Sequence, residues 1–235
     1  MLRHVFLDFG GTLARERRGR HEFYAEAARE AGLSVAPERM RLLMADAHAS
    51  LPARIGDAWR YDDAWFRAFM DRIFCGDLGL DRAALPALAT ELFERFSDPH
   101  TFRLYPGAIE LLEALERARL GVAILSNWSS ALPKLVLRLG LAPYVRTIVV
   151  SALEGVEKPD PEFFARALAR AGARPSVTLH AGDRLDQDCL GARTAGIGAI
   201  LVQHSESPPP PAAAGEFPIA TSLFELRDLI LERLA

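Results

Sequence analysis

The sequence is poor in lysine and carries little net charge. Only two of its 28 basic residues are lysines, Lys134 and Lys158, and the formal net charge at pH 7 is −3. With a sequence pI of about 6.1, the chain lacks the basic character of proteins that bind nucleic acid, so we expect no such partner. Because arginine supplies most of the positive charge, a lysine here suggests a role beyond general charge.

Cysteine and long hydrophobic runs are also scarce. Cys75 and Cys189 lie far apart, which indicates neither a disulfide framework nor a zinc site. No apolar stretch approaches the length of a membrane span, and no basic and apolar leader precedes the first apolar run. We therefore expect a cytoplasmic protein without a membrane partner. Half of the residues are apolar, which is typical of a globular protein with a sizeable core.

Four short apolar runs are each followed by polar residues. These runs, rich in β-branched residues and separated by helical stretches, predict a parallel sheet of βαβ units. Ligands bind outside the carboxyl ends of strands in such sheets, so the polar residues are expected to form one catalytic site. We call the polar residues that follow each run a signal. The runs are 4–7, followed by Asp8; 121–125, followed by Ser126 and Asn127; 147–150, followed by Lys158; and 177–181, followed by Asp183.

Between Arg15 and Asp98 the sequence shows helical patterning and no convincing strand. We predict an all-helical block inserted after the first strand, with the alternation of strands and helices resuming at Pro106. Asp81 is expected to cap the last helix of the block, and Pro86 to kink or restart it. The predicted helices of the block are 21–31, 37–49, 61–74 and 81–96. Those that follow are 107–118, 129–139, 160–171, 186–195 and 222–234.

Each signal alone has an ordinary structural explanation beside a chemical one. Asp8 is suited to a nucleophile facing a pocket, but an Asp also starts many glycine-rich turns. Ser126 and Asn127 can donate hydrogen bonds to an oxyanion or form a cap. Lys158 can neutralise a transferring phosphoryl group or be a solvated residue before a turn proline. Four signals in this order, each at a strand end, favour the chemical explanation.

The acidic residues of the fourth signal are ambiguous in the same way. Asp183 is suited to bind Mg²⁺, which prefers one or two carboxylates together with water and substrate oxygens. Asp186 and Asp188 are equally suited to the first turn of a helix, where the helix dipole favours negative charge.

Together the motifs resemble the haloacid dehalogenase superfamily, over essentially the whole chain. The matching residues are Asp8-x-x-Gly11-Thr12, Ser126-Asn127, Lys158-Pro159 and Gly182-Asp183-x4-Asp188. The helical insert is similar to the cap of subfamily I, and the stretch 104–107 before the return helix is also similar. The resemblance implies a Rossmann-like, doubly wound core formed by 1–14 and 103–235, with a helical cap at 15–102.

For most members the resemblance implies Mg²⁺-dependent phosphoryl transfer through an aspartyl-phosphate. Asp8 would be the nucleophile, and Ser126 and Lys158 would also take part in catalysis. The implied substrate-binding residues are Thr12, Ser126, Asn127 and Lys158. The implied metal site consists of Asp8, the carbonyl of Gly10, Asp183 and the supporting Asp188.

Gly10 departs from the pattern of the superfamily's phosphatases. These usually carry a second Asp at that position, acting as general acid and then as base. The implied metal ligand at residue 10 is its backbone carbonyl, which glycine also has, so metal binding is retained. The proton transfers made by the missing Asp side chain are lost. General acid–base catalysis typically contributes ~10²–10⁴-fold. Either another group, such as Glu16 or His21, replaces the missing acid, or the substrate has a leaving group that needs little help, as an acyl phosphate does.

Two other functions remain open. One is a hydrolase resembling the 2-haloacid dehalogenases, which lack the second Asp; Asp183 argues against it, because those enzymes are metal-free. The superfamily's phosphonate hydrolases need a cap lysine, and no lysine precedes Lys134. The other is a weakly active protein that binds a phosphorylated ligand. Retention of Asp8 and Lys158 beside Asp183 favours a phosphatase of a small phosphorylated metabolite.

The sequence leaves the substrate open. Arginines between Arg15 and Arg20 are suited to bind an anionic group, although a solvated charged face is slightly favoured. The aromatic residues of 61–69 are spaced for packing inside the cap. We expect a monomer or a dimer, and an extended loop at 207–215, which contains four consecutive prolines.

Overall fold

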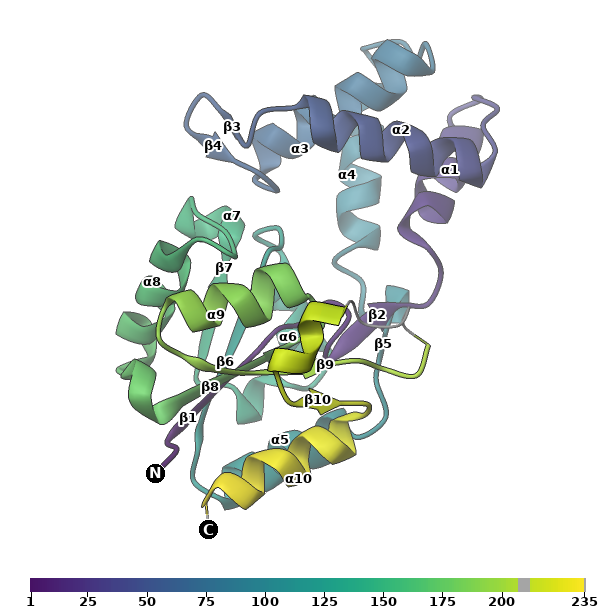
Figure 1. The fold of residues 1–235 in the computed structure, drawn as a ribbon. Coiled ribbons are helices and arrows are strands. Elements are labelled where there is room, and N and C mark those ends of the chain that lie inside the picture. Colours follow the sequence, from purple (N-terminus) through teal and green to yellow (C-terminus); the bar gives the residue numbers. More distant parts are fainter. Residues whose placement is uncertain (207–211, 235) are drawn as a thin grey trace.

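The computed structural model describes residues 1–206 and 212–234 and has a six-stranded sheet with helices on both faces (Figure 1). Every neighbouring pair of strands is parallel, in the order β10-β9-β8-β1-β6-β7. This arrangement confirms the predicted α/β class with a doubly wound parallel sheet. The strands are β1 (His4–Leu7), β6 (Gly121–Ser126), β7 (Thr147–Val150), β8 (Thr178–Gly182), β9 (Gly198–Val202) and β10 (Ile219–Ala220).

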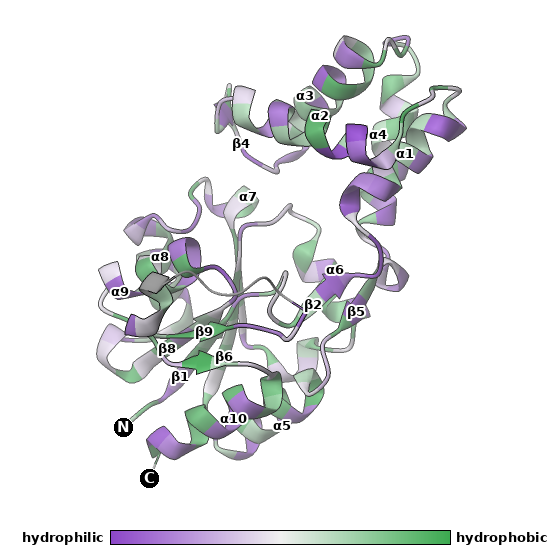
Figure 2. Ribbon diagram, turned by 45° about the vertical axis from the view of Figure 1, so that its right-hand side comes forward, coloured by the Kyte–Doolittle hydropathy of each residue, from purple (hydrophilic) through white to green (hydrophobic). Residues whose placement is uncertain are grey.

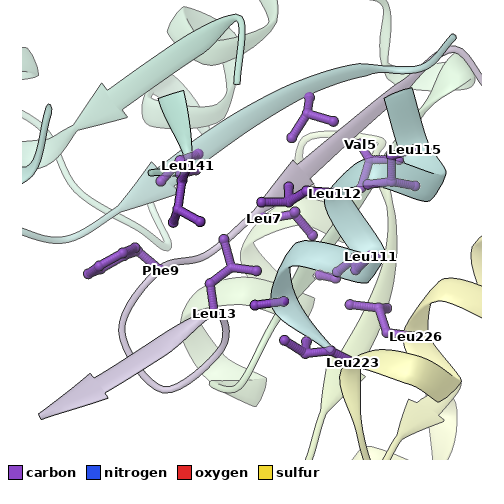
Figure 3. Packing of buried hydrophobic residues seen from close by; sticks show 14 of the residues in the cluster. Val5, Leu7, Phe9, Leu13, Leu111, Leu112, Leu115, Leu141, Leu223 and Leu226 are labelled. Carbon is purple, nitrogen blue, oxygen red and sulfur yellow. The ribbon is translucent and has the colours of Figure 1, made fainter. Parts of the chain in front are cut away.

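Alternate residues of each strand enter two apolar clusters on opposite faces of the sheet. Val5 and Leu7 pack in the cluster shown in Figure 3, with leucines of α5 and α10, whereas Phe6 packs against Phe163 and Phe164 of α8. Successive side chains of a strand point to opposite faces, so a strand buried on both sides is apolar throughout. The helices around the sheet are α5 (Ala108–Arg117), α6 (Leu132–Arg138), α7 (Ser151–Glu154), α8 (Pro161–Ala171), α9 (Gly191–Thr194) and α10 (Leu223–Leu231).

A second body of helices stands beyond one edge of the sheet, as Figures 1 and 2 show. Its core is a third apolar cluster that includes Tyr24, Trp65, Phe69 and Phe74. We refer to this helical body as the cap. Its elements are α1 (Arg20–Glu30), α2 (Pro37–Ser50), α3 (Asp63–Met70), a π-helical segment (Asp71–Asp77) and α4 (Leu85–Arg95).

The start of α4 corrects one prediction. Asp81 does not cap this helix: its Oδ1 accepts a hydrogen bond from the backbone N–H of Ala83, before α4 begins at Leu85. Pro86 stands in the first turn of α4, where a missing N–H leaves no hydrogen bond unmade. The proline therefore starts the helix rather than kinking it.

The prediction of no strand between Arg15 and Asp98 is wrong. β2 (Ala14–Glu16) pairs antiparallel with β5 (Phe102–Leu104), and β3 (Arg54–Ile55) pairs with β4 (Ala58–Trp59) in a hairpin within the cap. These strands are two or three residues long, too short for an alternation of apolar and polar residues to be recognised, so local periodicity does not reveal them. The predicted domain boundaries, after residues 14 and 102, both fall inside the β2–β5 ribbon.

Part of the predicted loop at 207–215 lies outside the described residues, and Ala212–Glu216 is a short 3₁₀ helix. Further 3₁₀ segments are Pro99–Thr101, Ala142–Tyr144, Pro175–Val177 and Glu232–Leu234, and a second π-helical segment covers Leu185–Leu190. Within 1–206 and 212–234, no helix is both long enough and apolar enough to cross a membrane.

Candidate active site

The polar residues that follow the strands meet at one edge of the sheet. Asp8 follows β1, Ser126 ends β6 and Asp183 follows β8, while Lys158 lies in the loop after α7. All four line one cavity of about 180 Å³, as the convergence of parallel strands predicts.

Asp8 is buried and receives two hydrogen bonds on the same oxygen. Lys158 Nζ lies 2.7 Å from Asp8 Oδ1, and Ser126 Oγ donates to that oxygen over 3.1 Å. The backbone N–H of Asp8 donates to the carbonyl of Ala181 in β8, which fixes the start of the loop. The two side-chain donors therefore hold the carboxylate in one orientation and leave its Oδ2 without a donor among the described residues.

Lys158 also lies 2.6 Å from Asp188 Oδ1, so the ammonium group bridges two carboxylates. Asp188 is fully buried; its Oδ1 contacts His180 Nε2 at 2.9 Å, and its Oδ2 accepts from the backbone N–H of Arg184 at 3.0 Å. Both oxygens of Asp188 are thus occupied by protein donors. This carboxylate orients Lys158 and is a poorer candidate for a direct metal ligand than Asp183.

The charges of these groups shift their pKa values in different directions. Burial raises the pKa of Asp8, although the positive charge of Lys158 opposes the shift. Burial also disfavours the ionised form of Asp188, but attraction to Lys158 and the interaction with His180 together outweigh burial and hold the pKa of Asp188 below its usual range. The pKa of Lys158 is raised because Asp188 and Asp8 together outweigh its own desolvation. Lys158 is therefore charged at neutral pH.

Asp183 provides the test of whether a metal ion fits this site. Its Oδ1 is buried and has no hydrogen-bond partner among the described residues, and carboxylate oxygens of Asp8, Asp183 and Asp188 lie within 4.8 Å of one another. Burial, followed by the negative charges of Asp8 and Asp188, raises the pKa of Asp183 to about 7. A buried acceptor without a donor and a crowded set of carboxylates are both relieved by a cation, so the residues fit Mg²⁺.

Gly11 makes room for Asp183. A Cβ atom on Gly11 would lie 2.4 Å from Asp183 Oδ2, and the φ of Gly11 is +89°, a value that residues with side chains rarely adopt. Any larger residue at position 11 would displace the carboxylate of Asp183.

The Asn127 side chain connects the second motif, Ser126-Asn127, to the third motif, Lys158-Pro159. Its Nδ2 donates to the carbonyl of Lys158 over 2.9 Å, and its Oδ1 accepts from the N–H of Lys158 over 2.8 Å. Asn127 lines the Asp8 cavity, whereas Thr12 does not: Thr12 is fully buried, and its carbonyl accepts a hydrogen bond from His204. The Thr12 hydroxyl is buried and has no hydrogen-bond partner among the described residues, so the role of Thr12 in substrate binding stays a prediction.

Trp128 occupies the space beside Gly10. A Cβ atom on Gly10 would lie 2.7 Å from Trp128 Cζ3, closer than such atoms approach in proteins. The Trp128 ring packs edge-on against Phe9, with ring centroids 5.4 Å apart, and Arg20 lies over its face at 5.2 Å. Gly10 and Trp128 are therefore matched, because the ring fills the volume that a side chain at position 10 would need.

The two groups considered as replacement acids do not line the Asp8 cavity formed by the described residues. Glu16 instead accepts hydrogen bonds from Arg20. His21 lies next to Arg20 in the first turn of α1. Among the predicted arginines, Arg18 pairs with glutamates of α1, and Arg15 pairs with Glu206. Only Arg20 lines a cavity beside Trp128.

Sequence reasoning missed three contributors: His180, Gln187 and Trp128. His180 is a histidine in an otherwise apolar strand, a signal that was available, and Gln187 Oε1 accepts from Asn127 Nδ2 over 3.3 Å. Trp128 directly follows the second motif, but its match to Gly10 depends on a contact between residues far apart in the chain.

Comparisons with known proteins agree with this geometry. A family model described as haloacid dehalogenase-like hydrolase matches residues 2–196. The haloacid dehalogenase-like hydrolase domain-containing protein 3 of Danio rerio is 29% identical over 210 residues, which are 87% of this chain and 86% of that protein. A phosphoserine phosphatase of Thermus thermophilus is 31% identical over 170 residues, 72% of this chain and 66% of that protein.

Among solved structures, a 2-haloacid dehalogenase from Pseudomonas syringae pv. Tomato DC3000 has a TM-score of 0.73 at 25% identity, with 100% of both chains covered. The solved structure shares the whole architecture, core and cap. The family match extends over most of the chain and includes all four motifs. As the motifs predicted, this chain belongs to the haloacid dehalogenase-like hydrolases.

Proposed function

We propose that this protein is a Mg²⁺-dependent phosphatase that acts on a small phosphorylated molecule through an aspartyl-phosphate on Asp8. The observation that carries the proposal is the convergence on one carboxylate: Lys158 and Ser126 hold Asp8 Oδ1 while the neighbouring Asp183 Oδ1 lacks a partner among the described residues. The phosphatases among its relatives support the same conclusion.

In the first step, an oxygen of Asp8 attacks phosphorus, and the bond between phosphorus and the leaving oxygen breaks. The leaving group departs with the electron pair of that bond. Lys158 remains charged beside Asp8 and stabilises negative charge on the transferring phosphoryl oxygens, and the Ser126 hydroxyl is placed to donate to one of them. The rigid support from Asp188 keeps the ammonium group in place.

In the second step, water attacks phosphorus of the aspartyl-phosphate, and the bond to the Asp8 oxygen breaks. The products are inorganic phosphate and the regenerated carboxylate, and the proton of the attacking water passes to the phosphate or to solvent. Carboxylates leave without protonation, so this step needs no acid at position 10.

Mg²⁺, where bound, would neutralise phosphoryl charge and orient the phosphate. The residues that would hold it are Asp8, the carbonyl of Gly10 and Asp183, which all line the Asp8 cavity. Asp188 would support the site through Lys158 rather than as a direct ligand, because both of its oxygens accept from protein groups.

The test is release of phosphate from acetyl phosphate and p-nitrophenyl phosphate, with Mg²⁺ or with a chelator. We expect turnover in wild type with Mg²⁺ and a loss in Asp8→Asn, together with an acid-stable mass increase of one HPO₃ group on wild type quenched during turnover. Halide release from 2-haloacids without Mg²⁺ would instead assign a dehalogenase. Tight phosphate binding without turnover of either compound would indicate a ligand-binding protein.

A further inference from the structure

A second cavity adjoins the Asp8 cavity and lies between the core and the cap. Its volume is about 130 Å³, and it shares Asn127 and Trp128 with the Asp8 cavity. A substrate whose phosphate reaches Asp8 therefore has this space available for its leaving group. Six of the residues that line it are aromatic: Tyr24, Tyr61, Phe66, Phe93, Phe96 and Trp128. A cavity of about 150 Å³ with apolar walls holds one benzene ring.

The one cationic group in the described lining of this cavity has its charge balanced within the protein. Arg20 donates two hydrogen bonds to Glu16 Oε1, over 3.1 and 2.5 Å, and its guanidinium group lies over the rings of Phe96 and Trp128 at 5.0 and 5.2 Å. A second phosphate or a carboxylate on the substrate would have to compete with Glu16. The cavity is therefore suited to an uncharged, planar group that stacks on aromatic faces.

The cap residue Tyr61 is held in an unusual backbone conformation at this wall. Its φ is +70°, which is uncommon for a bulky residue, and its hydroxyl lies 3.0 Å from His48 Nε2. Such strain persists only where the surrounding structure enforces it, and it gathers at binding sites. The conformation of Tyr61 at the aromatic wall is therefore enforced by the structure of the cap.

The absence of an acidic side chain at Gly10 restricts which leaving groups can depart. Trp128 fills the volume that an acid at position 10 would need, so the departing oxygen receives no proton from that position. A phenol, like the tyrosine side chain, has a pKa of about 10 and leaves as the anion. An alkyl alcohol is nearly as weak an acid as water, whose pKa is about 15.7. The site therefore favours a leaving group that is both aromatic and acidic.

We propose that the substrate is a small aryl phosphate monoester, whose single ring sits between Trp128 and the cap aromatics while its phosphate reaches Asp8. This proposal rests on the phosphatase function proposed above. The bond that forms joins Asp8 to phosphorus, and the bond that breaks joins phosphorus to the phenolic oxygen. The phenolate leaves with the electron pair and is protonated by solvent afterwards.

The experiment compares wild-type steady-state kinetics for four phosphates. Phenyl phosphate has the ring and the acidic leaving group, benzyl phosphate has the ring alone, cyclohexylmethyl phosphate matches benzyl phosphate in size without aromaticity, and acetyl phosphate tests the phosphoryl site without a ring. We expect kcat/KM, which reports the step in which the leaving group departs, to fall from phenyl to benzyl phosphate by ~10²–10⁴-fold, the range that a missing general acid predicts. We also expect a lower KM for benzyl than for cyclohexylmethyl phosphate.

A pair of serine variants tests where the ring sits. Ser129 lines the aromatic cavity, whereas the neighbouring Ser130 does not, and neither side chain makes a hydrogen bond within the described residues. Ser129→Leu fills the cavity, so KM for phenyl phosphate should rise about tenfold or more. Ser130→Leu should leave that KM unchanged, and both variants should hydrolyse acetyl phosphate as wild type does, which shows that they fold.

Two results would overturn the proposal while the phosphatase function stands. One is turnover of acetyl phosphate with equal kcat/KM for phenyl and benzyl phosphate, and the other is an unchanged KM for phenyl phosphate in Ser129→Leu. A failure to hydrolyse any of the four phosphates would refute the phosphatase function and this proposal together.

Discussion

Gly10 and Trp128 are two residues that compete for one volume beside Asp8, the proposed nucleophile. A side chain at position 10 would collide with a ring that Phe9, Phe102 and Arg20 hold in place. Loss of the usual acidic residue is therefore not an isolated change that a single substitution reverses. The Trp128 ring occupies the volume that a side chain at position 10 would need, and it also lines the neighbouring aromatic cavity.

We predict that Gly10→Asp alone does not restore acid–base catalysis. Overpacking against Trp128 should destabilise the protein by about 1–3 kcal/mol and lower activity. The double variant Gly10→Asp/Trp128→Ala removes the collision, and its turnover of benzyl phosphate should exceed that of Trp128→Ala by about tenfold or more. Urea denaturation and phosphate release measure the two effects. A stable and more active Gly10→Asp single variant would contradict the steric argument.

Asp183 and Asp186 form a matched pair for testing the metal site. Asp183 lies in the acidic cluster with an unpartnered oxygen among the described residues, whereas the Asp186 side chain is 62% exposed and pairs with Arg184. We predict that Asp183→Asn lowers Mg²⁺-dependent turnover on the order of 10²-fold or more, and that Asp186→Asn changes it little.

The same pair should differ in thermal stabilisation by the metal. An ion that binds only the folded state stabilises it by about 2.7 kcal/mol when its concentration is 100 times its Kd. Mg²⁺ should therefore raise the Tm of wild type and of Asp186→Asn but not that of Asp183→Asn. Equal shifts in both variants would place the metal elsewhere.

Among the secondary-structure elements, the strands of the core were easier to predict than those of the β2–β5 ribbon. Runs such as β6 are buried on both faces and are apolar throughout, so each carries its own signal. β2 and β5 are three residues long, and their pairing joins residues more than 80 positions apart, as in Glu16 with Phe102. Pairing of this kind depends on the partner strand and not on local sequence.

A capping side chain marks the start of the last helix, whereas Asp81 does not mark the start of α4. The sequence predicts the last helix over 222–234, and Ser222 Oγ accepts from the backbone N–H of Glu225 at the start of α10. We predict that Ser222→Ala lowers the free energy of unfolding by about 1 kcal/mol. The control is Ser34→Ala, at an exposed position, which should have little effect in the same urea titration. Equal losses in both variants would show that the cap contributes nothing.

At the scale of the whole molecule, an ion pair joins the cap to the core close to the candidate active site. Arg60, which follows β4, lies 2.8 Å from Glu157 Oε1, and the two side chains are only 20% and 19% exposed. Glu157 directly precedes Lys158. The pair therefore connects the position of the cap to the loop that carries the Lys158 ammonium group, which we propose to be catalytic.

We predict that Arg60→Ala favours separation of the cap from the core. An ion pair of this kind contributes up to about 1 kcal/mol, so KM should rise by no more than about fivefold. The radius of gyration measured by small-angle X-ray scattering should increase. Glu157→Gln should behave alike, and the double variant should add nothing further. Arg67→Ala removes an exposed cap arginine that makes no ion pair in the described residues, and it should match wild type.

The sequence by itself determined the family, the parallel core and the four polar signals. Each of these depends on residues adjacent in the chain: an apolar run, the polar residue that ends it, and the order in which the signals occur. The position of Asp8 at a strand end followed for the same reason, because parallel strands present their carboxyl ends at one edge.

Only the tertiary structure decided which groups share a function within that edge. It separated Asp183, which has an oxygen free for a cation among the described residues, from Asp188, whose oxygens are bound by Lys158, His180 and Arg184. It also brought Trp128 against Gly10 and the cap aromatics. These contacts are made through packing and charge between residues that are distant in the sequence. Local sequence patterns therefore do not predict them.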